Sequence, residues 1–164
     1  MISAIVAVDN NWGIGFNGNL LEHIPEDMKH FVHLTTGNVV VMGRKTWNSL
    51  PKKPLPNRTN IVITSNPVYF TEINGAYRQT LEDTIKDMNG MKDLDWFIIG
   101  GGQIYKELLP YCDSVYVTKI YKNHENVDTY FPNLDEMSGW TAAALAPVKN
   151  YKDLTYQFWR YDRI

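Results

Sequence analysis

The stretch from Trp96 to Tyr105, Trp-Phe-Ile-Ile-Gly-Gly-Gly-Gln-Ile-Tyr, constrains the fold more than any other part of the chain. Four consecutive large apolar residues, Trp96 to Ile99, are typical of a strand that is covered on both faces, as in a parallel sheet. The three glycines that follow have no Cβ, so a ligand could lie close to the backbone, and a helix from Gln103 would present its N-terminus to a phosphate. On this stretch alone, a strand-to-helix turn without a ligand is an equally good interpretation.

The rest of the chain alternates strands and helices. Strands are predicted at 2–8, 38–42, 59–64, 76–78, 96–99, 114–121, 140–148 and 155–161, and helices at 25–35, 44–50, 80–88 and 103–109. Residues 128–132 are interpreted as a loop or bulge. This order predicts an α/β fold of three layers over a single domain, 1–164, with about four helices. Its central sheet should be mainly parallel, with antiparallel C-terminal strands.

Bulk composition excludes several classes of protein. The net charge of -2 and the pI near 6.1 argue against a general nucleic-acid binder. Cys112 is the single cysteine, so neither an intrachain disulfide nor a cysteine-based metal site is expected, and no metal is predicted. The apolar run from Ile2 to Val8 has no basic residues before it and ends at Asp9, which indicates a strand rather than a signal peptide. No segment is long enough to span a membrane, so a cytoplasmic enzyme or binding protein is expected.

The segment from Asp9 to Glu22 is long, polar and rich in glycine. Its glycines lack the G-x-G-x-x-G spacing of a dinucleotide-binding turn, and no helix begins before Pro25. Loops of this length are more often lids than plain connectors, although a mobile surface loop is the alternative.

Phosphate-binding groups follow two further strands. Gly43-Arg44-Lys45-Thr46 offers a glycine, two cations and a hydroxyl at a helix start, although a capped surface helix with solvated cations is the alternative. Thr64 and Ser65 end the third strand and could add hydroxyls to the same pocket. Because ligands of open α/β sheets bind beyond the carboxyl ends of the strands, these groups should meet the glycines 100–102 at one edge.

Asp27 is the most informative acid. In the helix 25–35 it falls on the apolar arc, which contains Ile24, Met28, Phe31, Leu34 and Thr35, whereas Glu26, Lys29, His30 and His33 fall on the outer face. Burial there raises the pKa of a carboxyl group, which suits general-acid work or the binding of a cationic ligand group. The alternative is a first-turn aspartate that interacts with the helix dipole.

Taken together, these segments resemble the dihydrofolate reductase family over essentially the whole chain. The matching motifs are Ile14-Gly15, Pro25-Glu-Asp27-Met-Lys-His-Phe31, Val41-Met-Gly-Arg-Lys-Thr-Trp47, Pro54-Leu-Pro-Asn-Arg-Thr-Asn60, Ile98-Ile-Gly-Gly-Gly-Gln-Ile-Tyr105, Thr118 and Asp128-Thr-Tyr-Phe-Pro132. Each motif is weak alone, but all of them in order and at the family's spacing are highly specific.

The resemblance implies NADPH-dependent reduction of 7,8-dihydrofolate to tetrahydrofolate, with hydride added at pterin C6 and a proton at N5. Asp27 would hold the pterin and favour protonation of N5 through a water, and Thr118 would hydrogen-bond to Asp27. Arg58 would bind the α-carboxylate of the glutamate tail. The 9–22 segment would close over the site, with Asp128 as a hydrogen-bonding partner from a second loop.

The resemblance also assigns the remaining binding residues. Substrate would contact Ile5, Asp27, Met28, Phe31, Leu50, Leu55, Arg58, Ile99 and Thr118. NADPH would contact Ala7, Ile14, Gly15, Leu20, Gly43, Arg44, Lys45, Thr46, Thr64, Ser65, Ile99, Gly100, Gly101, Gly102, Gln103, Ile104 and Tyr105. A cis peptide between two of the glycines is expected in this family.

Two positions depart from the common pattern of the family. Leu21-Glu22 stands where many members have Pro-Trp, which places a second carboxylate within reach of the pterin pocket. We predict that the Glu22 side chain points outward to solvent, because two close buried carboxylates would be costly. Gln103 stands where many members have arginine near the adenosine end, and the loss of that cation weakens, but does not abolish, the case for NADPH over NADH.

Two alternatives remain. The first is the reductase of riboflavin biosynthesis, which has the same fold and uses NADPH but lacks an acid in the Pro-x-Asp context of Asp27. The second is a nucleotide-binding module without catalysis, in which Arg58 would have no purpose. Dihydrofolate is the expected partner of what should be a monomer, with no nucleic-acid or membrane partner.

Overall fold

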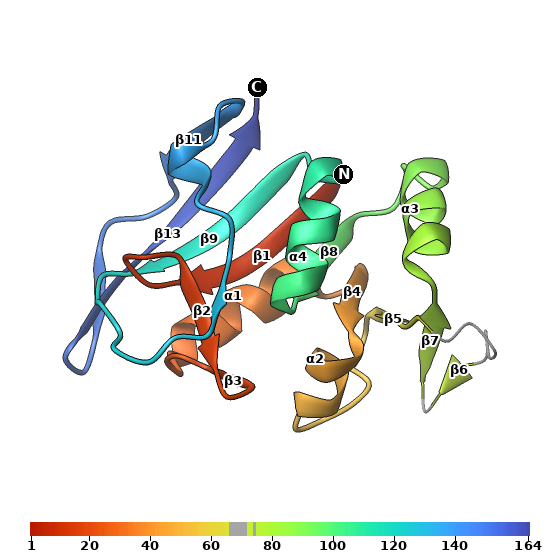
Figure 1. Cartoon of the computed structure of the whole chain (residues 1–164), viewed down its shortest axis with the longest axis horizontal. Coiled ribbons are helices and arrows are strands. Elements are labelled where there is room, and N and C mark those ends of the chain that lie inside the picture. Colours follow the sequence, from red (N-terminus) through yellow and green to blue (C-terminus); the bar gives the residue numbers. More distant parts are fainter. Residues whose placement is uncertain (66–71, 74) are drawn as a thin grey trace.

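The computed structural model describes residues 1–65, 72–73 and 75–164, shown as a coloured ribbon in Figure 1. The strands are β1 (Ile2–Val8), β2 (Gly13–Phe16), β3 (Asn19–Leu20), β4 (Val39–Gly43), β5 (Thr59–Ile63), β6 (Glu72–Ile73), β7 (Ala76–Gln79), β8 (Trp96–Gly100), β9 (Ser114–Ile120), β10 (Thr129–Tyr130), β11 (Trp140–Ala144), β12 (Lys149–Tyr151) and β13 (Leu154–Arg163). The helices are α1 (Pro25–Thr35), α2 (Arg44–Ser49), α3 (Leu81–Gly90) and α4 (Gly102–Leu108), with 3-10 turns η1 (Leu109–Tyr111) and η2 (Leu134–Glu136). No helix among these residues is long and apolar enough to cross a membrane.

The main sheet has the strand order β11-β13-β9-β1-β8-β4-β5-β7-β6, and β12 also pairs with β13. Its centre, from β9 through β1, β8, β4 and β5 to β7, is parallel. The pairs that involve β13 are antiparallel, as is the pair of β6 with β7. The predicted fold class, a mainly parallel sheet with antiparallel C-terminal strands, is therefore confirmed.

Helices cover both faces of the sheet, because successive residues of a strand point to opposite sides. Ala4 and Val6 pack in one cluster with Leu108 of α4 and Met88 of α3. Ile5, between them, packs in a second cluster with residues of α1 and α2. These two clusters make the three layers, and α4 lies across the sheet in Figure 1.

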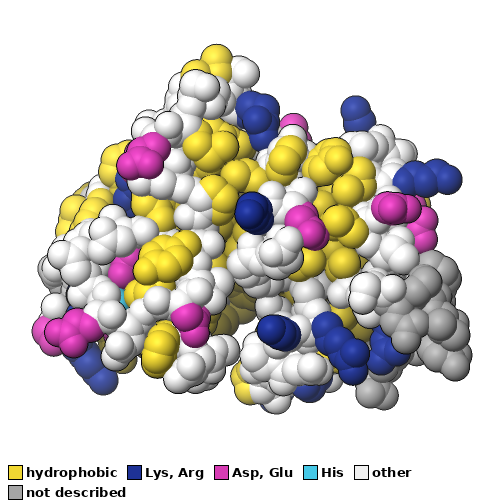
Figure 2. Space-filling view, viewed as in Figure 1, with side chains coloured by type: hydrophobic (Ala, Val, Ile, Leu, Met, Phe, Trp, Pro, Cys, Tyr) yellow, Lys and Arg dark blue, Asp and Glu magenta, His cyan; other side chains and the backbone are white. Residues whose placement is uncertain are grey.

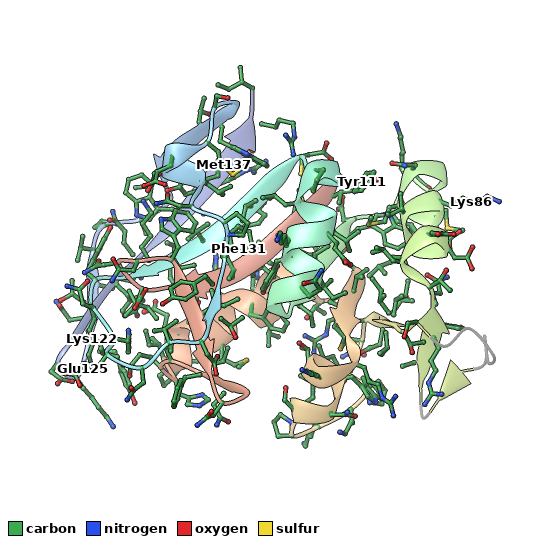
Figure 3. All side chains as sticks on the ribbon, viewed as in Figure 1. Lys86, Tyr111, Lys122, Glu125, Phe131 and Met137 are labelled. Atoms are coloured by element: carbon green, nitrogen blue, oxygen red, sulfur yellow. The ribbon has the colours of Figure 1, made fainter. Side chains whose placement is uncertain are left out.

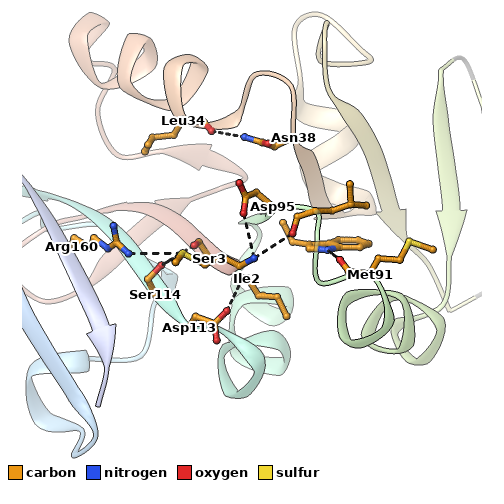
Figure 4. A network of polar contacts seen from close by, with 12 residues as sticks. Ile2, Ser3, Leu34, Asn38, Met91, Asp95, Asp113, Ser114 and Arg160 are labelled. Carbon is orange, nitrogen blue, oxygen red and sulfur yellow. Dashed lines mark hydrogen bonds and ion pairs between the residues drawn. The ribbon is translucent and has the colours of Figure 1, made fainter.

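Polar contacts close the sheet at the amino ends of its central strands (Figure 4). The backbone N–H of Ile2 donates to Asp113 Oδ2 at 2.8 Å, and the hydroxyls of Ser3 and Ser114 lie 2.8 Å apart. The N-terminal amine lies 3.3 Å from Asp95 Oδ1. These groups bind one another, and the predicted phosphate-binding segments lie at the opposite, carboxyl, ends.

Most predicted elements are present with ends shifted by one or two residues, but the 9–22 segment was incompletely predicted. It contains β2 and β3, which form a second sheet with β10 in the order β10-β2-β3. Asn17 and Gly18 form the turn between β2 and β3, with φ of 51° and 78°. Asn-Gly is a strong hairpin signal, since both residues adopt positive φ readily, and it was overlooked in the sequence.

The C-terminal strands also differ from prediction. The strand expected at 140–148 ends at Ala144, three residues before Pro147, and β12 follows as a separate strand. A proline has no N–H to donate to a neighbouring strand, so pairing stops there. Strand β6 was not predicted at all, because two residues carry too little periodicity to be recognised.

Candidate active site

Asp27 and Thr118 are brought together from α1 and β9. Thr118 Oγ1 donates a hydrogen bond to Asp27 Oδ1 at 2.6 Å, across 91 residues of sequence. Pro25 starts α1 and places Asp27 in its first turn, while Thr118 is buried beside Ala7 of β1. Burial raises the pKa of Asp27 above its ordinary value, and the hydrogen bond from Thr118 opposes this in part. The site thus holds a half-buried carboxyl group that can retain a proton more readily than a surface aspartate.

Tyr105 of α4 lies behind the same site, against strand β1. Its hydroxyl donates to the Ile5 carbonyl oxygen at 2.7 Å, so it ties α4 to β1 across the sheet. Burial raises the pKa of Tyr105 far above its ordinary value, and the nearby Asp27 charge adds to this effect. Tyr105 is therefore neutral and acts as a fixed hydrogen-bond donor.

An apolar wall extends from Asp27 along α1. Phe31, Leu50, Leu55 and Ile99 are partly buried and pack in one cluster with Ile5. Met28 is 54% exposed on the same helix, and Leu20 is 57% exposed on β3. Figure 2 shows the surface hollowed between the β2–β3 hairpin and α2, with hydrophobic side chains in the hollow and Lys and Arg side chains on the α2 side. Exposed apolar groups beside such a hollow are available to a flat, largely apolar ligand.

Arg58 lies at the far end of this wall. Its Nη1 donates to Thr35 Oγ1 at 3.1 Å and its Nε donates to the Pro56 carbonyl oxygen at 2.8 Å. The guanidinium carbon is 5.8 Å from the centre of the Phe31 ring. The guanidinium is held in place and keeps N–H groups for a carboxylate ligand, because arginine has five N–H donors.

Asn60 was missed as a site-building residue, although it lies within a motif. Its side chain is completely buried and makes three hydrogen bonds, to the N–H and carbonyl of Leu55 and to the carbonyl of Arg58. A single amide group thus fixes the turn that carries both Leu55 and Arg58. The available signal was an Asn in an otherwise apolar strand, where an unpaired amide would be costly.

The glycine turn after β8 meets the start of α2. Gly43 pairs in register with Ile63 of β5. A Cβ on Gly43 would lie 3.9 Å from the Gly100 carbonyl oxygen, and one on Gly101 would lie 3.4 Å from Thr46 Oγ1. Gly100 has φ of 128°, which side chains rarely adopt, and the Gly100–Gly101 peptide is cis, as expected. The two predicted phosphate-binding segments therefore share one edge of the sheet and leave it lined by backbone.

The remaining predicted cofactor residues differ in their exposure. Arg44, Lys45 and Ser65 are exposed, whereas Thr46, Thr64, Gly101 and Gly102 are half-buried and Gly100 is buried. Gln103 is exposed and its Nε2 donates to Glu107 Oε1 at 2.8 Å. Ile104, Tyr105 and Ile14 are buried, Ile99, Ala7, Gly15 and Gly43 are half-buried, and Leu20 is exposed. The buried members support the site from behind, and the exposed ones can reach a ligand.

The predicted contact between the two loops is present. Asp128 Oδ2 accepts from the N–H of Asn17 at 3.0 Å, and the Asp128 N–H donates to the Gly15 carbonyl at 3.0 Å. The β2–β3 hairpin is therefore attached to the segment that leads into β10.

The Glu22 side chain is only 21% exposed rather than turned freely to solvent as predicted, and it pairs with His124 and Lys122. Its Oε2 lies 2.7 Å from His124 Nε2 and 3.4 Å from Lys122 Nζ. Burial alone would raise the pKa of Glu22, but the bonds with His124 and Lys122 outweigh it and hold the pKa below its ordinary value. His124 was missed entirely, because its partners are remote in sequence.

A second correction concerns His30, which was assigned to the outer face of α1. Its ring stacks on Phe158 of β13 at a centroid distance of 4.2 Å, and burial lowers its pKa. The sheet continues past α1 on this side, so a face that looks polar in the sequence is partly covered.

Known proteins match this chain throughout. The family model for dihydrofolate reductase matches residues 1–163. Dihydrofolate reductase of Bacillus subtilis is 38% identical, covering 99% of this chain and 95% of that protein. The Mycobacterium leprae enzyme is 34% identical, covering 99% and 98%. A solved structure, dihydrofolate reductase from Enterococcus faecalis complexed with NADP(H) and RAB-propyl, is 36% identical with a TM-score of 0.82, covering 99% of this chain and 96% of that one. The chain belongs to the dihydrofolate reductase family.

Proposed function

We propose that Asp27, held by Thr118, is the acidic group of the reaction that this enzyme catalyses, the NADPH-dependent reduction of 7,8-dihydrofolate to tetrahydrofolate. The observation that supports this role is the 2.6 Å hydrogen bond on a half-buried carboxyl group at the head of an apolar wall. When ionised, the carboxylate accepts hydrogen bonds from the pterin amino group and ring N–H. Asp27 gives up its proton, which reaches N5 through water, and the negative charge left on the carboxylate favours the cationic, N5-protonated pterin.

The substrate tail would follow the wall away from Asp27. Met28, Phe31, Leu50 and Leu55 contact the benzoyl portion, and the α-carboxylate of the glutamate binds Arg58. These contacts fix the orientation of the pterin relative to Asp27, which is the main contribution of binding groups that do not react.

NADPH supplies the hydride that is added at pterin C6. The residues at the carboxyl edge fit such a cofactor, because Gly43, Gly100 and Gly101 leave backbone open to it. A Cβ on Gly43 would lie 3.0 Å from Ile104, and the φ of 128° at Gly100 disfavours any side chain there. The phosphates would bind Arg44, Lys45, Thr46, Thr64 and Ser65. We expect Arg44→Gln to raise the KM for NADPH more than that for NADH, because the 2′-phosphate is the group that distinguishes them.

The test of Asp27 is the loss of reduced-nicotinamide absorbance with NADPH and dihydrofolate. Asp27→Asn should abolish most turnover near neutral pH, whereas Asp93→Asn, on an exposed position before β8, should leave it unchanged. Turnover that survives in Asp27→Asn would move the acid role elsewhere, with Glu22 as the next candidate.

We further propose that residues 1–164 act as one domain and as a monomer in the cytoplasm, with no nucleic-acid partner. The net charge of -2 supports the last point. Sedimentation of the enzyme with and without NADPH tests the monomer, and a dimer mass at micromolar concentration would contradict it.

A further inference from the structure

Both ends of the 9–22 segment meet on one histidine. Asp9 follows β1 and Glu22 precedes α1, and the imidazole of His124 lies between their carboxylates. Nδ1 is 3.1 Å from Asp9 Oδ2, and Nε2 is 2.7 Å from Glu22 Oε2. The backbone N–H of His124 also donates to Asp9 Oδ2 at 3.2 Å. His124 therefore links the two ends of a segment whose strands β2 and β3 form a sheet with β10.

Ionised carboxylates can only accept hydrogen bonds, so each ring nitrogen must donate for both contacts to be favourable. A neutral imidazole has one N–H, whereas imidazolium has two. Asp9 Oδ1 accepts from the N–H groups of Asn11 and Gly13 at 3.0 and 2.8 Å as well. The complete bridge thus requires the charged form of His124, and loss of one proton sets a nitrogen lone pair against a carboxylate.

The bridge lies in a largely enclosed part of the structure. The Asp9 side chain is completely buried, the Glu22 side chain is 21% exposed and the His124 side chain is 11% exposed. Lys122, which binds Glu22, and Glu125 are the other charged residues around the polar hollow of about 560 Å³ between the 16–21 and 122–126 segments. Figure 3 shows Lys122 and Glu125 on the loop at this end of the molecule.

We propose that His124 is a positioning residue for hydride transfer, which in its charged form bridges Asp9 and Glu22 and thereby fixes the 9–22 segment against the cofactor edge. It also keeps the Glu22 carboxylate paired, so that Asp27 remains the only carboxyl group presented to the pterin. The inference rests on the proposed location of the cofactor beside this segment. It adds a pH-sensitive support that is separate from the contact of Asp128 with Asn17.

The first test uses the unmodified enzyme with bound NADPH. Nitrogen NMR of the histidine rings follows the protonation of His124 over roughly pH 5 to 8, where histidine ordinarily titrates. Amide-exchange protection of residues 10–21, corrected for intrinsic rates, is measured over the same range. Protection should fall about tenfold as His124 loses its proton, since one charge-assisted hydrogen bond is lost.

Two variants, His124→Asn and Glu22→Gln, distinguish a role of His124 in positioning the 9–22 segment from a role in the stability of the fold. His124→Asn should reduce both the protection of 10–21 and the single-turnover rate of hydride transfer about tenfold at about pH 6, with the KM for dihydrofolate changed less than about twofold. His33→Asn, at an exposed position of α1, is the matched control and should change neither. In Glu22→Gln, the amide can accept from a protonated Nε2 or donate to a bare one, so the pH dependence of protection should disappear.

The proposal would be overturned if amide-exchange protection of residues 10–21 did not change as His124 loses its proton. It would also be overturned if a folded His124→Asn enzyme showed reduced protection of residues 10–21 but an unchanged rate of hydride transfer. If His124→Asn does not fold, the unmodified enzyme and Glu22→Gln still decide the matter. Asp27→Asn should slow hydride transfer while leaving protection intact. Normal hydride transfer in that variant would refute the proposed acid without affecting the protection measurements.

Discussion

Removing the Thr118 hydroxyl should move the pH dependence of hydride transfer. Thr118 donates to Asp27 at 2.6 Å from a buried position, and this bond stabilises the ionised carboxylate. Thr118→Val keeps the shape of the side chain but removes the donor, so the pKa of Asp27 rises further. Because reduction consumes a proton, the rate falls as pH rises, and a site that retains its proton longer should remain active to higher pH.

The magnitude follows from the strength of the bond. A hydrogen bond to a charged group contributes about 1.5–3 kcal/mol. Asp27 is only half-buried, and water can replace the hydroxyl, so we expect the lower end of this range. At about 1.4 kcal/mol for each tenfold change, the pH at which the rate is halved should rise by about one unit.

The assay is single-turnover oxidation of NADPH by dihydrofolate, with deuterated NADPH to show that hydride transfer is observed. Thr118→Ser keeps the hydroxyl and is the matched control, whose profile should stay close to that of the unmodified enzyme. A Thr118→Val profile that superimposes on the unmodified one, or moves to lower pH, would refute the assignment of the titrating group to Asp27.

Three further substitutions test other parts of the site. Asn60→Ala removes three buried hydrogen bonds that hold the 55–58 turn. It should therefore lower the free energy of unfolding by about 2–4 kcal/mol and raise the KM for dihydrofolate. An unchanged KM would contradict this role of Asn60. Gly102→Ala places a Cβ 2.6 Å from the methyl group of Thr129 in β10, so the free energy of unfolding measured with denaturant should fall by about 1–3 kcal/mol. A Cβ at Gly90 has no atom within 4 Å, so Gly90→Ala is the control and should leave the free energy of unfolding unchanged. Gln103→Arg should tighten NADPH binding about two- to fivefold at low salt, measured by fluorescence titration; equal affinity at low and high salt would contradict an electrostatic contact.

The layered sheet was predictable because its signals are local. Four large apolar residues before three glycines indicate a buried parallel strand, and Pro25 marks a helix start. Thr80 caps α3 by a local contact of the same kind, since its hydroxyl accepts from the Asp83 N–H at 3.1 Å. The glycine turns were recognisable for the same reason, since they depend on backbone that only glycine leaves open.

Contacts between remote residues were not predictable from spacing. The role of Thr118 rested on family resemblance, because 91 residues separate it from Asp27. His124 had no such guide, and 115 residues separate it from Asp9. Glu22 was assigned to solvent because a second buried carboxylate is unfavourable when considered alone.

The sequence by itself determined the helices, the glycine turns and the longer strands of the main sheet, and that an acid lies on the apolar face of α1, because these depend on local periodicity and backbone freedom. Only the tertiary structure decided which partner each polar group has. The partly buried Glu22 is tolerated because the fold places His124 and Lys122 against it, so its charge is compensated by residues about a hundred positions away. Polar residues that are remote in sequence, such as Glu22 and His124, become neighbours because the order of the strands in the sheet brings their segments together. That order depends on the packing of the whole chain, so local patterns do not reveal it.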